Sequence, residues 1–240
     1  MPVLVMGAKI ISHRGRTSKN SKDNSLQAVS DAIDLGVDMV EVDVRRTKDS
    51  QIICFHDFAI GSIPIANLNY SEIVETNSQI PTLEQVLWLA KDKIEIDVEL
   101  KESGYESDVI TMVIDYFDYD SFTMKSFNLN AVKTIKETNP KIHTGMLLGS
   151  SYSFNQFLHV INESFTCNNF NETRADFISP YYKIFEAGWL LRFSKRQIPI
   201  QVWTVNDKEL LRTLINQEVH SIITDVPELA LEIRESISNV

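Results

Sequence analysis

The sequence predicts one α/β domain folded as a single (β/α)8 TIM barrel, and three observations lead to this prediction. The chain has 240 residues, close to the roughly 250 that such a barrel typically needs. Short apolar runs alternate with longer amphipathic stretches, which is the pattern of parallel strands joined by helices. Several apolar runs end in charged side chains, and the carboxyl ends of barrel strands all meet at one mouth.

The elements can be placed along the chain from these patterns. Thr82 before the 83–90 stretch is a typical helix start, and so is Asp207 before 208–215. The predicted strands are 10–12, 39–44, 52–55, 94–100, 121–124, 143–148, 177–178, 200–204 and 222–223. The predicted helices are 25–35, 83–90, 106–116, 129–137, 152–162, 186–195, 208–215 and 228–236.

The connection between strands 39–44 and 52–55 breaks the alternation. It is too short for a parallel crossover, which needs about a dozen residues, so we expect a hairpin that turns near residues 49–50. Pairing about this turn sets Asp43 opposite His56. The serine of the turn tolerates a positive φ less readily than glycine does, which leaves a wider turn open.

Two segments are expected to be irregular. One is the stretch 150–173, which is rich in Ser, Asn and Phe. The other is 58–80, a short insertion that follows the hairpin over the barrel mouth. Within one domain spanning 1–240, these segments are the main interruptions of the barrel pattern.

Charge and cysteine content restrict the partners and the compartment. Acidic residues outnumber basic ones by 33 to 23, for a formal net charge of −10, so bulk attraction to nucleic acid or anionic lipid is not expected. Cys54 lies inside an apolar run far from Cys167, which favours a small buried side chain over half of a disulfide. The apolar segment 1–9 is too short for a signal peptide or membrane span. We expect a cytoplasmic enzyme, or alternatively the soluble domain of a longer membrane-tethered protein.

The most informative local feature is a pair of alternating acids, Glu41 and Asp43, in an otherwise apolar run. Because side chains alternate along a strand, both carboxylates lie on one face. A buried carboxylate pair repels itself and loses hydration, so it needs a cation or several donors. His13 and His56 each close a neighbouring apolar run and can exchange protons near neutral pH. These residues favour a metal-assisted hydrolytic site over a solvent-facing acid pair with two hydrogen-bonded histidines.

A second acidic run, 94–101, supports this interpretation. It carries Asp97, Glu99 and Lys101 on one strand face and delivers its carboxyl end to the same mouth. Asp97 lies deeper in the barrel and is expected to pair with Lys101. The remaining histidines lie outside these patterns and are expected to be structural; they are His143, His159 and His220.

A set of short motifs follows one order along nearly the whole chain. They are His-Arg-Gly at 13–15, Lys-Asp-Asn-Ser at 22–25, Glu-Val-Asp-Val-Arg from 41, Thr-Lys-Asp from 47, Phe-His-Asp from 55, Pro-Thr-Leu-Glu from 81, Val-Glu-Leu-Lys from 98, Lys-Ser-Phe from 125, Val-Trp-Thr-Val-Asn from 202 and Ile-Ile-Thr-Asp from 222. In this ordered set the chain resembles the glycerophosphodiester phosphodiesterase family.

The resemblance implies a phosphoric diester hydrolase that converts glycerophosphodiesters to glycerol 3-phosphate and an alcohol. It implies a divalent cation held by Glu41, Asp43 and Glu99. An all-oxygen ligand set suits Mg²⁺ or Ca²⁺ and argues against Zn²⁺. The implied partner is a small-molecule substrate, without nucleic acid.

The resemblance also implies roles for the other residues at the mouth. His13 and His56 would share the acid–base work, one as general base toward the nucleophile and the other as general acid toward the departing alkoxide. Arg14 and Lys101 would bind the nonbridging phosphate oxygens. Trp203 would form a wall of the glycerol or headgroup pocket, with ordinary barrel packing as the alternative. The nucleophile would be the neighbouring glycerol hydroxyl, which gives a cyclic phosphate that water then opens.

The chain departs from the family pattern in two places. Lys22 and Asp23 replace the proline and glutamate of a Pro-Glu-Asn-Thr motif, and the shorter acid is expected to reach less far toward Arg14. The insertion 58–80 is short and lacks the family's Asp-Arg-Thr-Thr-type signature, which predicts a more open cleft.

Three alternative functions share the barrel. A lysophospholipid-cleaving enzyme of the phospholipase D type would use the same site with a lipid tail in the cleft. A noncatalytic phosphodiester-binding barrel is disfavoured by the intact histidines. A metal-independent phosphatidylinositol-cleaving phospholipase C is disfavoured by the three acids Glu41, Asp43 and Glu99.

Overall fold

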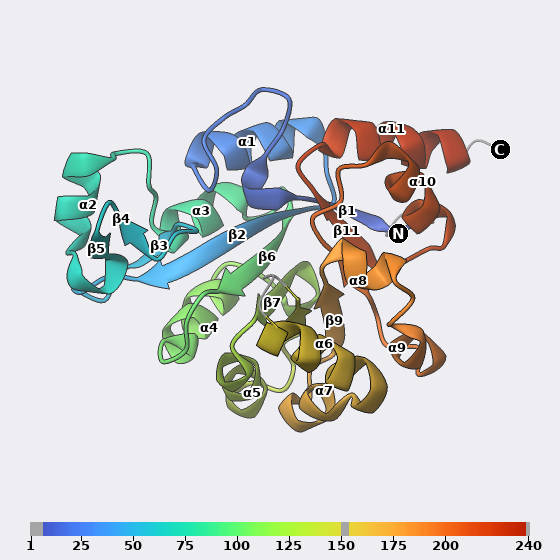
Figure 1. The fold of residues 1–240 in the computed structure, drawn as a ribbon. Coiled ribbons are helices and arrows are strands. Elements are labelled where there is room, and N and C mark those ends of the chain that lie inside the picture. The colour runs from blue at the N-terminus through green and yellow to red at the C-terminus, as the bar shows by residue number, and fades with distance from the viewer. Residues whose placement is uncertain (1–6, 150–153, 239–240) are drawn as a thin grey trace.

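The computed structural model describes the backbone of residues 7–149 and 154–238, and the side chains of these residues except 154–159. Eight parallel strands curl around a common axis (Figure 1). In sheet order they are β10 (Gln201–Val202), β11 (Ser221–Thr224), β1 (Lys9–Ser12), β2 (Met39–Arg46), β6 (Glu95–Leu100), β7 (Phe122–Ser126), β8 (Thr144–Leu148) and β9 (Phe177–Pro180).

The strands β9 and β10 bring the two ends of this order together. Isolated parallel bridges join Ile178 to Ile200 and Tyr181 to Trp203, and the Trp203 N–H donates to the Pro180 carbonyl at 3.1 Å. The predicted barrel is therefore confirmed. Every predicted strand is present, although the strand expected at 200–204 is shortened to β10.

Helices surround the strand ring (Figure 1). They are α1 (Leu26–Leu35), α3 (Leu83–Ala90), α4 (Glu106–Ile114), α5 (Leu129–Thr138), α6 (Phe154–Thr166), α7 (Asn168–Thr173), α8 (Tyr182–Glu186), α9 (Leu191–Lys195), α10 (Lys208–Asn216) and α11 (Pro227–Ser238), with 3₁₀ turns η1 (His13–Gly15) and η3 (Tyr119–Ser121). The helix predicted at 186–195 is wrong: two short helices flank Gly188, whose φ of 70° cannot continue a helix. Within the described ranges, no helix is both long and apolar enough to cross a membrane.

The helix predicted at 152–162 is confirmed as α6, which continues to Thr166. The expectation of an irregular excursion over 150–173 is wrong for 154–173, because α7 follows α6 directly and Val160, Cys167 and Phe170 are buried in an apolar core. Residues 150–153 lie outside the described part of the chain, and so does the side chain of His159.

The barrel interior is polar, whereas the apolar cores lie between the sheet and the helices. A small apolar layer of Ile11, Met39 and Ile223 packs inside, with Trp203 against it. Cys54 is a buried free thiol, as expected, and Cys167 is one as well. Buried charged and polar side chains of the barrel strands include Glu41, Asp43, Asp97, Glu99, Lys125, Ser179 and Gln201. Buried charges need partners or a cation, so the interior acids nearest the mouth are candidates for a binding site.

The predicted hairpin exists, but its predicted register is wrong by one residue. β3 (Ile52–Cys54) pairs antiparallel with the end of β2. The Phe55 N–H donates to the Asp43 carbonyl at 2.9 Å, so Asp43 faces Phe55 and not His56. The chain leaves β3 before His56, and this side chain enters the mouth from the following loop.

The turn of the hairpin accounts for the shift. The Thr47 N–H donates to the Gln51 carbonyl at 2.9 Å, which leaves residues 48–50 as the loop. Ser50 has a φ of 65°, as expected for a turn that ends in a left-handed residue. This loop is wider than two residues and moves the partner strand by one position.

The segment 58–80 is an ordered subdomain. It contains β4 (Ala59–Ile60), β5 (Ile63–Pro64), η2 (Ile65–Asn67) and α2 (Tyr70–Thr76). A separate apolar cluster that includes Ile53, Ile65 and Ile73 holds it together. In the view of Figure 1 these elements lie to the side of the strand ring, beyond α3.

Candidate active site

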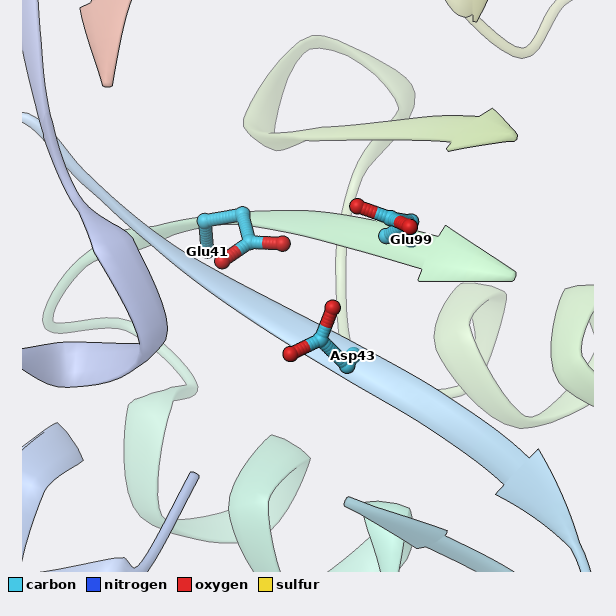
Figure 2. Close-up of side chains that lie close together, drawn as sticks. All are labelled: Glu41, Asp43 and Glu99. Carbon is cyan, nitrogen blue, oxygen red and sulfur yellow. The ribbon is translucent and has the colours of Figure 1, made fainter. Parts of the chain in front are cut away.

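Three carboxylates converge at the carboxyl ends of the barrel strands (Figure 2). Glu41 and Asp43 come from β2 and Glu99 from β6, and the parallel register sets Asp43 directly opposite Glu99. One oxygen from each residue lies within 4.8 Å of the others, and the residues are 1%, 0% and 7% exposed. The structure therefore brings together the three side chains that the sequence indicates as cation ligands.

Burial and mutual repulsion perturb these carboxyl groups. Burial, reinforced by Asp43, raises the pKa of Glu41 to about 7. Burial also raises the pKa of Glu99. Burial acts in the same direction on Asp43, but Lys101 and Arg14 outweigh it and hold the pKa of Asp43 below its usual range. The trio is therefore short of positive charge, which an additional cation would supply.

The two oxygens of Asp43 differ in their hydrogen bonding. Asp43 Oδ2 accepts a hydrogen bond from Asn24 Nδ2 at 2.9 Å. Asp43 Oδ1 is buried and makes no hydrogen bond, although Lys101 Nζ lies 2.8 Å away as an ion pair. Carboxylate oxygens are the ligands that hard divalent cations prefer, so these residues fit such an ion and could hold it.

Asn24 orients Asp43 through two reciprocal hydrogen bonds. Besides the contact from its amide nitrogen, Asn24 Oδ1 accepts the Asp43 N–H at 3.0 Å. Asn24 is buried and has a φ of 59°, a conformation that asparagine tolerates better than most residues. Sequence analysis assigned no role to Asn24, and its place in the Lys-Asp-Asn-Ser motif was the only signal.

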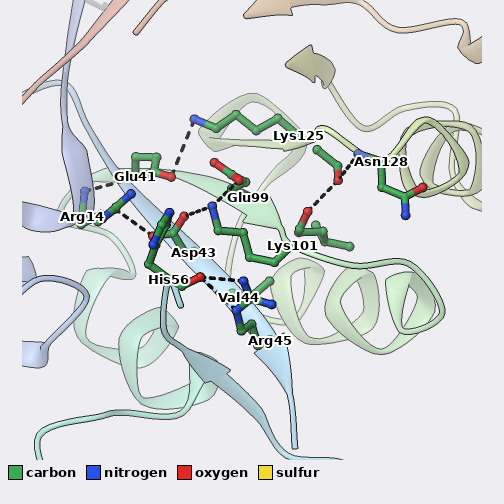
Figure 3. Close-up of polar contacts among 12 residues, drawn as sticks. Arg14, Glu41, Asp43, Val44, Arg45, His56, Glu99, Lys101, Lys125 and Asn128 are labelled. Carbon is green, nitrogen blue, oxygen red and sulfur yellow. Dashed lines mark hydrogen bonds and ion pairs between the residues drawn. The ribbon is translucent and has the colours of Figure 1, made fainter. Parts of the chain in front are cut away.

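Two cations predicted to bind phosphate lie against the carboxylates (Figure 3). The Arg14 N–H donates to Glu41 Oε2 at 3.1 Å, and Arg14 Nε lies 3.0 Å from Asp43 Oδ2. Lys101 Nζ lies 2.5 Å from Glu99 Oε1. Their side chains are 18% and 11% exposed, so both border the mouth and its solvent.

The backbone around Arg14 needs the glycine that follows it. Arg14 has a φ of 56° and Gly15 a φ of 75°. A Cβ at Gly15 would lie 2.7 Å from the Ala28 carbonyl carbon of α1, which is too close for any other residue. The His-Arg-Gly motif therefore describes a tight approach between η1 and α1.

Asp23 contacts both arginines beside the mouth. It binds Arg16 through two hydrogen bonds of 2.6 and 2.7 Å, and its Oδ2 lies 3.5 Å from Arg14 NH1. Its main partner is therefore Arg16. Its contact with Arg14 is longer, as expected for an aspartate in place of the longer glutamate of the family motif.

His13 is held by Asp225, a residue that sequence reasoning missed. His13 Nδ1 lies 2.7 Å from Asp225 Oδ1, and Asn206 Nδ2 donates to Asp225 Oδ2 at 2.7 Å. Burial opposes ionisation of Asp225, but the hydrogen bonds from His13 and Asn206 and the charge of Arg16 lower its pKa to about 2. An ionised carboxylate only accepts, so Nδ1 of His13 carries the proton and Nε2 remains for proton exchange.

His56 is fixed by its neighbours in the loop after β3. Its Nδ1 lies 2.8 Å from Asp57 Oδ1, and its carbonyl accepts two hydrogen bonds from the Arg45 guanidinium at 3.0 and 2.7 Å. Burial and the charge of Lys101 lower the pKa of His56, so its imidazole is mainly neutral at pH 7.

Trp203 belongs to an aromatic wall beside the mouth. Its ring meets Phe127 edge-on at 5.5 Å between centroids and Tyr181 at 5.4 Å. The indole N–H donates to the Ser179 carbonyl at 2.8 Å, which fixes the ring at the end of β10. This position is compatible with both sequence interpretations, because the half-buried ring packs inside the barrel and also borders the mouth.

The expected partner of Asp97 is wrong. Asp97 binds Lys125, with Nζ of the lysine 2.6 Å from Oδ2, whereas Lys101 pairs with Glu99 and Asp43. Lys125 lies on the neighbouring strand β7 opposite Glu99 and leans back to Asp97, whereas Lys101 lies at the mouth and pairs with Glu99 and Asp43.

Two of the histidines outside the motifs lie at the other end of the barrel. His143 and His220 precede β8 and β11 and line a cavity of about 200 Å³ with Lys9 and Glu95. In barrels of this type that end contributes to stability, and the chemistry takes place at the mouth.

The fold and this site define a class of barrel enzymes that hydrolyse phosphoric diesters. Within it, the chain belongs to the glycerophosphoryl diester phosphodiesterase family, whose profile matches residues 13–229.

Several relatives match nearly the whole chain. A glycerophosphodiester phosphodiesterase from Caldanaerobacter subterraneus is 25% identical over 250 residues, covering 95% of this chain and 98% of its own. The crystal structure of a glycerophosphodiester phosphodiesterase from Parabacteroides distasonis has a TM-score of 0.80 at 26% identity, over 96% and 98% of the two chains. An Oleispira antarctica phosphodiesterase in complex with the product sn-glycerol-3-phosphate shares the fold, with a TM-score of 0.78 at 19% identity over 95% and 97%.

Proposed function

We propose that this enzyme hydrolyses glycerophosphodiesters to sn-glycerol 3-phosphate and an alcohol, with one divalent cation held by Glu41, Asp43 and Glu99. The observation that carries the proposal is the convergence of three buried carboxylates at the mouth, one of them with a buried oxygen that makes no hydrogen bond. Family membership and the product held by the Oleispira antarctica enzyme support the choice of substrate. When bound, Mg²⁺ or Ca²⁺ would neutralise and polarise the phosphate.

Arg14 and Lys101 bind the nonbridging oxygens of the phosphate in this proposal. Both cations border the mouth and already lie against carboxylates. A cation in the trio would compete with them for those carboxylates, so their charges would become available to the substrate. The planar guanidinium of Arg14 can grip two phosphate oxygens at once. Trp203 and its aromatic neighbours would receive the glycerol or the headgroup.

The two histidines divide the proton transfers. His56 is mainly neutral at pH 7 because its pKa is lowered, so it accepts the proton of the attacking hydroxyl. Asp225 holds His13 through Nδ1 and leaves Nε2 toward the mouth for proton exchange, so His13 gives a proton to the departing alkoxide. The attacking group is the neighbouring glycerol hydroxyl, which forms a cyclic phosphate as the alcohol leaves. Water then opens the cyclic phosphate.

Removal and return of the cation test the metal assignment. Exhaustive chelation should abolish turnover of glycerophosphocholine, and Mg²⁺ or Ca²⁺ should restore it better than Zn²⁺. Calorimetric titration of the chelated protein should show one binding event, and Asp43→Asn should lose it. Full activity in metal-free protein would exclude this proposal.

Substitution of the histidines tests the proton transfers. His13→Ala and His56→Ala should each lower kcat by roughly 10²–10⁴-fold. The double variant should lose far less than the product of the two, because the pair acts as a unit. His143→Ala, at the other end of the barrel, is the matched control and should retain nearly full activity. Equal losses for His143→Ala and His56→Ala would show that the site is assigned wrongly.

A further inference from the structure

The buried ammonium of Lys125 takes no part in the proposed reaction, yet it lies beside the carboxylate trio (Figure 3). Its side chain is 1% exposed, and Nζ lies 2.6 Å from Asp97 Oδ2 and 3.9 Å from Glu41 Oε1. β7 pairs with β6 so that Lys125 stands opposite Glu99. The lysine therefore places a positive charge within the group of interior acids.

Asp97 anchors this ammonium. Besides Lys125, Asp97 accepts hydrogen bonds from Thr123 Oγ1 at 2.7 Å and from Gln201 Nε2 at 3.1 Å. Burial of two charges costs several kcal/mol per ion, and a well-packed apolar pair is often as stable or more so. Stability alone therefore does not account for an ion pair at this position.

Lys125 differs from the two cations at the mouth because it cannot reach a substrate. Arg14 and Lys101 are partly exposed and can turn toward a phosphate, whereas the Lys125 side chain is enclosed. The ion pair with Asp97 holds the Lys125 ammonium inside the barrel, so this residue is a permanent positive charge of the interior.

Charge balance indicates what this permanent charge does. Arg14, Lys101 and Lys125 together leave one of the four interior carboxylates uncompensated; these carboxylates are Glu41, Asp43, Asp97 and Glu99. Without Lys125 two would be uncompensated, and the acids would attract a divalent cation more strongly. Lys125 also repels an arriving cation directly, since like charges at short range in a protein interior interact strongly.

We propose that Lys125, anchored by Asp97, is an internal counter-ion that stabilises the cation-free site and weakens its affinity for the divalent cation, so that the cation exchanges. This inference rests on the proposed cation site of Glu41, Asp43 and Glu99. It assigns Lys125 a positioning role that acts through the carboxylates and not through the substrate.

A charge series tests the inference on the whole protein. Chelated wild type, Lys125→Met, Asp97→Asn and the double variant are titrated with Ca²⁺ and with Mg²⁺ by calorimetry. Lys125→Met should bind the cation at least about tenfold more tightly than wild type, and Asp97→Asn should bind it about tenfold more weakly. The double variant has the net charge of the wild type and should fall within about threefold of it. The cation concentration for half-maximal activity should shift in the same order.

The two single variants separate charge from structural damage. A purely structural role would weaken cation binding in both, because both would disorder the trio. That result, or equal affinities across the series, overturns the inference. If Lys125→Met does not fold, Asp97→Asn must still bind more weakly and the double variant must recover wild-type affinity. A wild type that binds neither Ca²⁺ nor Mg²⁺ would instead refute the proposed cation site itself.

Discussion

At the scale of single residues, the proposed acid–base chemistry depends on how each imidazole is held. Both oxygens of Asp225 are used, one by His13 Nδ1 and one by Asn206 Nδ2. Arg16 NH1 adds a contact of 2.9 Å to the same carboxylate. Because Asp225 is fixed from several sides, the ring it holds has one orientation and one tautomer, which is what a proton donor requires.

Asp225→Asn should therefore lower kcat by roughly 10²-fold or more while KM changes little. The amide cannot stabilise charge on His13, and Asp225 supports His13 without a role in substrate binding. Steady-state kinetics with glycerophosphocholine provide the measurement. Asp115→Asn is the control: Asp115 is an exposed residue that caps the C-terminal end of α4, and this variant should behave as wild type. A loss of under threefold in Asp225→Asn would exclude the positioning role.

The residues of the proposed site were predictable to different degrees. Glu41 and Asp43 could be found because strand periodicity alone puts both on one face. Glu99 and the roles of the histidines needed the family resemblance. The partner of Asp97 could not be deduced, because a lysine on the neighbouring strand competes for it and the direction in which each side chain leans decides the outcome. Asn24 was missed because its contact to Asp43 depends on a left-handed backbone that the sequence does not reveal.

At the scale of elements, the long periodic segments were predicted well and the tight turns were not. The eight barrel strands are apolar runs bounded by polar residues, which is a strong signal. The elements β4, β5 and α2 are short, and their apolar cluster forms only in the folded subdomain. The hairpin register depends on one residue in its loop. Ser50 adopts a left-handed conformation there, which a two-residue turn model does not include.

Ser50→Gly should stabilise the protein. A non-glycine residue in the left-handed region costs about 1–2 kcal/mol, and the added freedom of glycine in the unfolded chain offsets part of this gain. We expect a net gain of about 0.5–1 kcal/mol, or roughly 1–4 °C in melting temperature.

Thermal unfolding of the metal-free protein provides the measurement for this substitution. Ser62→Gly is the control: Ser62 lies in the exposed turn between β4 and β5, outside the set of residues with positive φ. Glycine there should leave the melting temperature unchanged or lower it. A Ser50→Gly protein no more stable than wild type would contradict the strain argument, and activity should be unchanged in both variants.

At the scale of the whole molecule, closure of the barrel brings the ends of the chain together at the site. β1 and β11 pair with Ser12 opposite Thr224, so the residues that follow each strand, His13 and Asp225, become neighbours although they are far apart in sequence. The hairpin then supplies His56 from a loop beside β2. The site thus depends on both halves of the chain, and its polar groups come from strand ends and not from the 58–80 subdomain.

This arrangement predicts weak discrimination between alcohol headgroups. The groups proposed to contact glycerol phosphate come from the strands, whereas the 58–80 subdomain lies to the side of the strand ring. Specificity is a difference in transition-state binding, so few headgroup contacts give little discrimination. The kcat/KM values for choline, ethanolamine and glycerol diesters should agree within about tenfold, or about 1.4 kcal/mol.

A panel of these diesters, with a lysophospholipid added to test a lipid tail in the cleft, should be assayed across a wide range of protein concentration. The concentration series matters because a second copy of the chain could supply the contacts that the subdomain does not. Values that stay within tenfold and do not depend on protein concentration support an open mouth. A strong preference for one headgroup at every concentration would show that another element of the same chain closes over the substrate. A preference that grows with concentration would assign that role to a partner.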